Sequence, residues 1–236
     1  MPSCSPPCTA CGSDGSCSGA TGVGVTSEPP PDTLAALVED ARRLAARPGR
    51  TILGLTGAPG AGKSTVAAVL ADALGTELVA LAPMDGFHLD AAILHARGAR
   101  GRKGAIDTFD DAGYAALLAR LRSQGPDEIV YAPRYDRDLE TSIGSALPIS
   151  PSVPLVVTEG NYLLARAGAW PQARAALDEV WFLDLDPRLR EARLVERHVR
   201  HGEDPARARE RALGPDQSNA VAVESFRDGA TRVVRL

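Results

Sequence analysis

The chain has 236 residues, of which 44% are apolar and 24% are charged, and its formal net charge is −4. These values indicate a globular protein with one buried core, and they argue against a nucleic-acid-binding protein, because neutralising phosphates takes clustered cations. No apolar run approaches the roughly 20 residues of a membrane-spanning helix, so we expect a cytoplasmic protein with neither a nucleic acid nor a membrane as its partner.

The first 32 residues differ in composition from the rest of the chain. They are rich in Ser, Gly, Pro and Thr and contain few large apolar side chains, so apolar burial cannot offset the entropy lost on ordering. All four cysteines lie in this segment: Cys4, Cys8, Cys11 and Cys17. No histidine lies near them, which makes zinc binding the less favoured interpretation. The sequence therefore predicts a disordered tail over residues 1–32 and one folded domain over residues 33–236.

From residue 33 onward, predicted helices alternate with predicted strands. Apolar residues at helical spacing predict helices over residues 33–47, 64–75, 111–123, 187–201, 204–214 and 218–230, and a helical start at residue 91. Short apolar runs predict strands over residues 51–57, 77–83, 128–133, 154–160, 179–186 and 231–236. Residues 134–151 are expected to be irregular. The alternation predicts an α/β fold whose mainly parallel sheet is covered on both faces, a three-layer sandwich.

A glycine-rich loop separates the first predicted strand from the helix that follows it. Its sequence GAPGAGKS fits the pattern GxxxxGK[ST], in which backbone amides turn towards phosphate oxygens without intervening side chains. In this pattern Lys63 reaches the terminal phosphates and the hydroxyl of Ser64 can bind Mg²⁺. A chance glycine-rich turn is the alternative, which the flanking strand and helix disfavour. The predicted ATP-binding residues here are Gly57, Ala58, Pro59, Gly60, Ala61, Gly62, Lys63, Ser64 and Thr65.

The remaining motifs favour a kinase among the proteins that use such a loop. The sequence contains neither an NKxD motif for reading guanine nor the LSGGQ motif of transport ATPases, and it is too short for a helicase core. Lysine is rare in this chain: Lys63 and Lys103 are its only lysines, against 24 arginines. An arginine cluster therefore carries less information here than a lysine does.

Two acidic residues follow predicted strands at positions where a parallel sheet binds its ligands. Asp85 comes after the strand over residues 77–83, and Glu159 lies at the end of the strand over residues 154–160. Glu159 and Ser64 are the expected partners of Mg²⁺, and Asp85 is the expected base that accepts a proton from the acceptor hydroxyl. The roles of the two acids could be exchanged or shared, and a capping role in a turn is the structural alternative for Asp85.

Six segments of the chain, taken in order, resemble one family of P-loop kinases. They are GAPGAGKST, MDGFHLD, RKGAIDTFD, APRYDRDLE, VVTEGNYLL and LDPRLREARLVERHVRHG. The family includes uridine kinase, phosphoribulokinase and bacterial pantothenate kinase, and the resemblance extends over nearly all of residues 50–236. It implies a P-loop NTPase fold with an Arg-rich lid helix, Asp85 as general base, and Ser64 and Glu159 as organisers of Mg²⁺. The DGF form of the second segment is more similar to pantothenate kinase than to uridine kinase, which leaves the acceptor open.

The Arg-rich helix predicted over residues 187–201 carries the candidate lid residues. Arg193, Arg197 and Arg200 occupy positions i, i+4 and i+7, so they share one helix face and could converge on phosphate oxygens. Arg193 and Arg197 are the predicted ATP-binding pair, and a solvated helix face is the alternative for each arginine taken singly. The candidate residues for recognition of a hydroxylated acceptor are His88, Lys103, Tyr135 and Arg137, with Tyr135 as a stacking surface for a ring.

These observations predict a kinase that uses ATP and Mg²⁺, with Lys63 and Asp85 as catalytic residues, to phosphorylate a hydroxyl group of a small metabolite. A nucleoside is the favoured acceptor, and pantothenate or a sugar are alternatives within the same family. A regulatory ATPase that binds nucleotide without a small-molecule acceptor is the alternative from another class. A homodimer is compatible with the sequence, but no motif predicts it.

Overall fold

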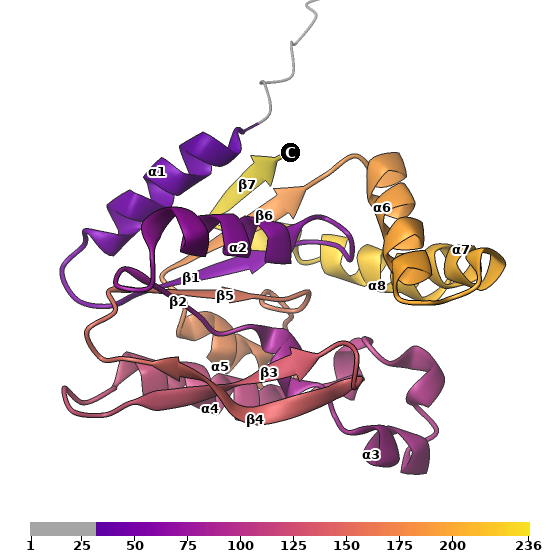
Figure 1. The fold of residues 1–236 in the computed structure, drawn as a ribbon, viewed down its shortest axis with the longest axis horizontal. Helices are drawn as coiled ribbons and strands as arrows, with labels where there is room; N and C mark the ends of the chain where they lie inside the picture. The colour runs from indigo at the N-terminus through magenta and orange to yellow at the C-terminus, as the bar shows by residue number, and fades with distance from the viewer. Residues whose placement is uncertain (1–31) are drawn as a thin grey trace, which may run out of the picture.

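A computed structural model describes residues 32–236, which form an α/β fold around a five-stranded sheet (Figure 1). The strands lie in the order β2-β5-β1-β6-β7, and every neighbouring pair is parallel. Their bounds are Thr51–Thr56 for β1, Val79–Leu81 for β2, Leu155–Glu159 for β5, Glu179–Asp184 for β6 and Arg232–Arg235 for β7. The predicted parallel sheet is confirmed. The four cysteines and the predicted tail up to residue 31 lie outside the described residues.

Helices cover both faces of the sheet, as the sequence predicts: α1 and α2 lie over one face, and α4 and α5 over the other (Figure 1). The α-helices are α1 (Leu34–Ala45), α2 (Lys63–Leu74), α3 (Ala91–Ala96), α4 (Asp111–Arg122), α5 (Trp170–Ala175), α6 (Pro187–Arg200), α7 (Pro205–Leu213) and α8 (Pro215–Glu224). Short 3₁₀ helices are η1 (Met84–Phe87), η2 (Arg100–Arg102), η3 (Ile106–Thr108) and η4 (Arg227–Gly229). None of the helices within residues 32–236 has the length and apolar character needed to cross a bilayer.

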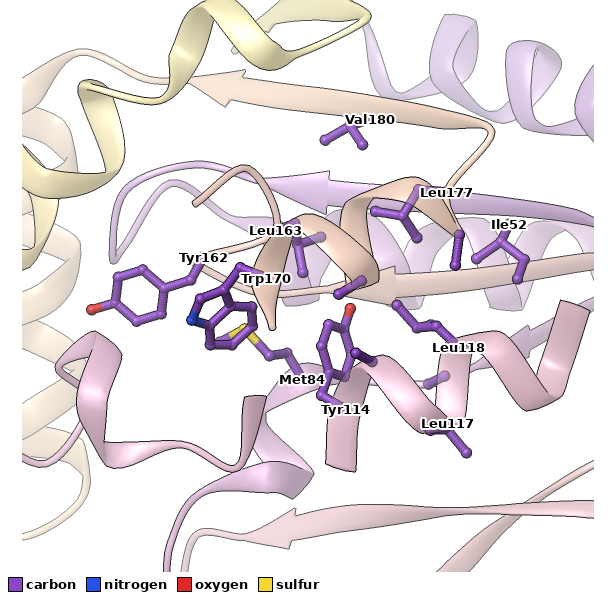
Figure 2. Packing of buried hydrophobic residues seen from close by; sticks show 14 of the residues in the cluster. Ile52, Met84, Tyr114, Leu117, Leu118, Tyr162, Leu163, Trp170, Leu177 and Val180 are labelled. Carbon is purple, nitrogen blue, oxygen red and sulfur yellow. The ribbon is translucent and has the colours of Figure 1, made fainter. Parts of the chain in front are cut away.

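Alternation along the strands divides the core between the two faces of the sheet. On β6, Trp181 packs into the cluster formed with α1 and α2, whereas the next residue, Phe182, packs into the cluster on the opposite face. In that second cluster, Tyr114 of α4 and Trp170 of α5 lie with ring centroids 5.9 Å apart, near Met84 (Figure 2). Because Met84 is fully buried there, the core holds the η1 turn in place at the end of β2.

The expectation of an irregular segment over residues 134–151 is wrong. β3 (Val130–Asp136) and β4 (Thr141–Ile149) pair as an antiparallel hairpin that forms a separate two-stranded sheet. Pro133 hides the strand pattern, because proline donates no ladder hydrogen bond, and the register shifts between Ala132 and Arg134. The six-residue helix α5 was not predicted either, because fewer than two turns show no helical period.

The hairpin packs against η1 at Gly86, where no larger residue fits. A Cβ atom at Gly86 would lie 2.4 Å from the carbonyl oxygen of Pro133 and 2.7 Å from its carbonyl carbon. Gly86→Ala is therefore expected to push the hairpin away from η1 and to lower the free energy of unfolding by about 2 kcal/mol. Gly125→Ala is the matched control, since nothing lies within 4 Å of a Cβ atom there. Urea denaturation measures both variants, and equal midpoints would contradict the packing argument.

Candidate active site

The glycine-rich loop between β1 and α2 is enclosed by backbone from other elements. Its three glycines all have positive φ angles, 145° at Gly57, 84° at Gly60 and 96° at Gly62. A Cβ atom at Gly57 would lie 2.6 Å from the carbonyl oxygen of Leu183 on β6, and one at Gly60 would lie 2.9 Å from that of Arg190 on α6. Glycine is therefore required at these positions by the backbone conformation and, at the first two, by close approach.

Lys63, the first residue of α2, is buried at the base of this loop. Its side chain is folded over the loop, where Nζ donates hydrogen bonds to the carbonyl oxygens of Gly57 at 2.8 Å and Ala58 at 3.1 Å. Burial lowers the pKa of Lys63 to about 8, although the carboxylates of Glu159 and Asp85 act in the opposite direction. The lysine and both predicted acids are thus close enough to interact electrostatically.

The lowered pKa of Lys63 has a measurable consequence for ATP binding. Above about pH 8 the free lysine is partly neutral, and phosphate oxygens would stabilise its ammonium form. Proton uptake per bound ATP is therefore expected to increase between about pH 7 and pH 9. Calorimetry without Mg²⁺, in buffers that differ in ionisation enthalpy, measures this uptake. The measurement is made in the Glu159→Gln variant, because Glu159 is the other group expected to titrate in this pH range. If proton uptake per bound ATP stays constant with pH in this variant, the lowered pKa assigned to Lys63 is contradicted.

The two predicted acids lie on neighbouring parallel strands at the same edge of the sheet. Glu159 is the last residue of β5, and Asp85 lies in η1, directly after β2. A Cβ atom at Gly160 would lie 2.5 Å from the Sδ atom of Met84, so the turn after β5 is packed tightly against η1. A buried hydrogen bond of 2.5 Å from Thr158 Oγ1 to the carbonyl oxygen of Ala82 also ties β5 to the chain after β2. This packing brings the predicted base and the predicted metal ligand together.

Glu159 combines burial with contact to charged and polar groups. Its side chain is 8% exposed, and burial raises its pKa to about 7, with Asp85 acting in the same direction. Lys63 and a hydrogen bond from the Ser64 side chain act in the opposite direction. The Ser64 hydroxyl and the Glu159 carboxylate, the two predicted Mg²⁺ ligands, are therefore adjacent.

Ser64 and Glu159 fit a site in which protein and nucleotide oxygens bind one Mg²⁺ ion together. Among the described residues no group of three or more His, Cys, Asp or Glu side chains could hold a metal by itself. Mg²⁺ is commonly bound through one or two protein oxygens together with substrate phosphates and water, so a hydroxyl and one carboxylate beside the phosphate loop suffice. Ser64 and Glu159 are the residues that would hold it.

The side chain of Asp85 is partly accessible and pairs with the hairpin. Its Oδ2 atom lies 3.1 Å from a terminal guanidinium nitrogen of Arg137, and the Asp85 side chain is 26% exposed. The backbone oxygen of Asp85 lies 2.8 Å from Nδ1 of His88. Burial lowers the pKa of His88, and the charge of Asp85 opposes this shift. The Asp85 side chain makes no capping hydrogen bond in η1; it pairs with Arg137, and its charge acts on Lys63 and Glu159.

The four predicted acceptor residues gather beside Asp85 from three separate segments. His88 follows η1, Lys103 follows η2, and Tyr135 and Arg137 belong to the hairpin and its turn. The rings of His88 and Tyr135 have centroids 4.8 Å apart, and Nζ of Lys103 lies 4.9 Å above the Tyr135 ring. The structure therefore joins residues up to about fifty positions apart into one patch.

The arginines of α6 divide into two groups. A terminal nitrogen of Arg193 lies 3.8 Å from the position of a Cβ atom at Gly62, next to the phosphate loop. Arg197 is half-buried, and burial lowers its pKa, with the charge of Arg137 acting in the same direction. Arg200 instead pairs with Glu196 at 2.7 Å, and both side chains are more than two-thirds exposed. The solvated-face alternative thus describes Arg200. Arg193 is exposed as well but lies beside the loop, and Arg197 is half-buried and lines a cavity with Arg137 of the hairpin turn.

Sequence reasoning missed Arg190, whose side chain is buried against the phosphate loop. One terminal nitrogen donates a hydrogen bond to the carbonyl oxygen of Pro59 at 3.2 Å, and the other contacts Gln217 of α8. Arg190 therefore joins the loop, α6 and α8. The helical spacing from Arg190 to Arg193 and Arg197, i, i+3 and i+7, is the signal that could have identified it.

Comparisons with known proteins show that this chain is similar to several kinases. The chain is 38% identical over 145 residues to an ATP-dependent kinase-like protein of Aspergillus versicolor, covering 58% of this chain and 84% of the relative. It is 35% identical over 162 residues to a candidate uridine kinase of Schizosaccharomyces pombe, covering 65% of this chain and 68% of the relative. The crystal structure of a candidate fructose transport system kinase from Silicibacter sp. TM1040 matches with a TM-score of 0.75 and 39% identity, over 86% of this chain and 98% of that one. No model of a protein family matches the chain.

Proposed function

The chain belongs to the P-loop kinase family that includes uridine kinase, phosphoribulokinase and bacterial pantothenate kinase, and from this premise we propose that it transfers the γ-phosphoryl group of ATP, with Mg²⁺, to a hydroxyl of a nucleoside. Membership in the family makes it a small-molecule kinase. The nucleoside is favoured by the similarity to uridine kinases, and pantothenate or a sugar are the alternative acceptors.

The observation that carries the proposal is the grouping of Asp85, Lys63 and Glu159 at one edge of the sheet. The acceptor hydroxyl gives its proton to the Asp85 carboxylate while its oxygen bonds to the γ-phosphorus, and the bond from that phosphorus to the β-γ bridging oxygen breaks. Lys63 and the loop amides stabilise the charge on the transferring group. Ser64 and Glu159 would hold Mg²⁺, which would supply further positive charge to the phosphates.

Two arginines of α6 lie where they can bind the phosphates during the same reaction. Arg193 lies beside the phosphate loop and Arg197 lies near Asp85 and Arg137, so both can reach phosphate oxygens. We propose that closure of α6 and α7 over the nucleotide excludes water and suppresses hydrolysis of ATP.

A regulatory ATPase without a small-molecule acceptor is the second candidate function. Such a protein has no need for a carboxylate beside the γ-phosphate, nor for the polar patch formed by His88, Lys103 and Tyr135. These features favour the kinase.

An acceptor panel tests the proposal. ADP release is measured with nucleosides, pantothenate and sugars added one at a time, and products are identified by mass. We expect one class to raise ADP release well above the rate with ATP alone and to gain one phosphoryl group. ADP release that stays at the acceptor-free rate with every compound would favour the regulatory ATPase.

A further inference from the structure

Lys103 belongs to the patch of four predicted acceptor residues and has no carboxylate partner among residues 32–236. It is half-buried, its Nζ donates a hydrogen bond of 2.7 Å to the backbone oxygen of Glu140, and no carboxylate of residues 32–236 lies within ion-pair distance of it. The other lysine of the chain, Lys63, serves the phosphate loop. In a chain with 24 arginines, a second lysine on the acceptor side indicates a specific requirement for a compact cation.

Two further cations lie close to the same space. Arg137 lowers the pKa of Arg197, second to the effect of burial, so the two guanidinium groups repel each other. Burial is the main cause of the lowered pKa of His88, Asp85 opposes it, and Lys103 and Arg137 lower it further by smaller amounts; His88 contacts both Asp85 and Tyr135. Arg197 has no carboxylate within ion-pair distance in the described part of the chain, although the charges of Asp216 and Asp85 act on it from further away, and Arg137 has only Asp85. An anion bound among these cations would relieve their mutual repulsion.

Two cavities next to the hairpin turn have the size of a small-metabolite site, and the first is lined by Arg137, the ion-pair partner of Asp85. One of about 500 Å³ lies between the hairpin and the lid and is lined by Tyr135, Arg137 and Arg197 among others. Lys103 lines an adjoining cavity of about 750 Å³, whose other cations are Arg100, Arg207 and Arg211 and whose acids are Glu140, Glu203, Asp204, Glu210 and Asp216. The acids in the first cavity are Asp138 and Glu140, both exposed on the hairpin turn, and Glu203, which pairs with Arg211.

The ring of Tyr135 already contacts the side chains of His88 and Lys103. His88 lies 4.8 Å from its centroid, and Nζ of Lys103 lies 4.9 Å above the ring. A neutral base that stacks on Tyr135 where Lys103 lies would have to displace the ammonium group, whereas an anionic group can bind to that ammonium directly. This arrangement favours recognition by charge over recognition by stacking.

We infer that the acceptor of this kinase carries, besides its reacting hydroxyl, a carboxylate or phosphate group that Lys103 and Arg137 bind. The inference rests on the proposed kinase activity and replaces the neutral nucleoside as acceptor by an anionic one: a phosphorylated nucleoside, a hydroxy acid or a sugar phosphate. Arg137 then exchanges its contact with Asp85 for the anion, which leaves the carboxylate free to accept the hydroxyl proton.

Matched acceptor pairs provide the first test. Each pair contains a neutral alcohol and its anionic counterpart, with sugars set against sugar phosphates, polyols against hydroxy acids, and nucleosides against nucleoside monophosphates. We expect the anionic member of the preferred pair to have a kcat/KM at least about tenfold higher, as a charge-assisted contact implies. Which pair responds distinguishes phosphate from carboxylate. A preference for neutral acceptors would overturn the inference and leave the kinase assignment intact.

Variants of Lys103 separate recognition from a structural role. Lys103→Met is expected to raise KM for the anionic acceptor at least about tenfold while leaving KM for ATP and for the neutral member unchanged, and Lys103→Arg should recover part of the loss. The matched control is Arg102→Met, which removes a neighbouring cation that pairs with Asp107 at the surface. An equal loss of kcat/KM for both members of a pair would show that Lys103 only supports the hairpin through Glu140.

Binding of inorganic phosphate tests the same site without any knowledge of the acceptor. The protein is first saturated with AMP-PNP and Mg²⁺, so that the phosphate loop is filled, and is then titrated with inorganic phosphate. We expect phosphate binding that Lys103→Met weakens at least about tenfold and Arg102→Met does not. If no compound of the panel or of the matched pairs is phosphorylated, the proposed function fails. This titration still decides the inference, because phosphate binding that is absent or insensitive to Lys103 would overturn it.

Discussion

Lys63→Ala is expected to abolish phosphoryl transfer and to weaken ATP binding at least about a hundredfold, because the variant loses charge-assisted hydrogen bonds to the terminal phosphates. The same ammonium group stabilises charge that develops in the transition state, where removal of one donor costs about a further hundredfold in rate. Isothermal calorimetry and a coupled assay for ADP measure the two effects separately.

The control for Lys63→Ala removes one cation elsewhere. Arg120→Ala changes the net charge equally but breaks only an ion pair with Glu128 at the surface. Lys63 is buried beside Glu159 and Asp85, so urea denaturation of the variant must show that the domain still unfolds cooperatively. A folded Lys63→Ala variant that binds ATP as tightly as the unaltered protein would contradict the role assigned to the loop.

Asp85→Asn is expected to reduce turnover by about 10²- to 10⁴-fold while changing the dissociation constant of ATP by less than about threefold. The amide keeps the size of the side chain, but it cannot accept the hydroxyl proton. It also removes one of the charges that raise the pKa of Glu159, so Glu159 is expected to ionise at lower pH in the variant. The loss should appear in kcat, since the group acts on the reacting hydroxyl.

Calorimetry with ATP and steady-state kinetics with the acceptor identified by the panel check the Asp85 prediction. The matched control is Asp72→Asn, which removes one negative charge from the exposed face of α2. Undiminished turnover of Asp85→Asn would remove the catalytic base from the mechanism. A large loss of ATP affinity in the same variant would instead assign Asp85 to nucleotide or metal binding, the exchanged roles that the sequence leaves open.

The agreement between sequence and structure is closest where backbone geometry demands particular residues. Gly57, Gly60 and Gly62 can be recognised from the printed chain because a phosphate loop needs positive φ angles and close approach, which few other residues tolerate. The end of β5 at Glu159 and the end of β2 shortly before Asp85 can also be predicted, because a buried strand is a run of apolar residues and its end is abrupt. Position after a parallel strand then places both acids at one edge of the sheet.

The hairpin, and the contacts among the four predicted acceptor residues, could not be predicted from the sequence in the same way. β3 and β4 form a separate two-stranded sheet, and Pro133 interrupts their alternation, so no local pattern predicts their pairing. The contact between Lys103 and Tyr135 depends on where the hairpin lies relative to the chain after η2, and long-range contacts such as Gly86 against Pro133 and Ser142 with His88 determine that position. The sequence could name these side chains as polar candidates but not state which of them touch.

The sequence by itself determined the α/β order of elements, the phosphate loop with Lys63 and the two acids after strands, because each is encoded by neighbouring residues and short-range geometry. Only the tertiary structure decided that Arg190 is buried against the loop, that Arg200 faces solvent and that Lys103 has no carboxylate partner among residues 32–236. The physical reason is that burial and pairing of a charged side chain depend on which distant segments pack beside it, and contacts between distant segments leave no periodic signal in the chain.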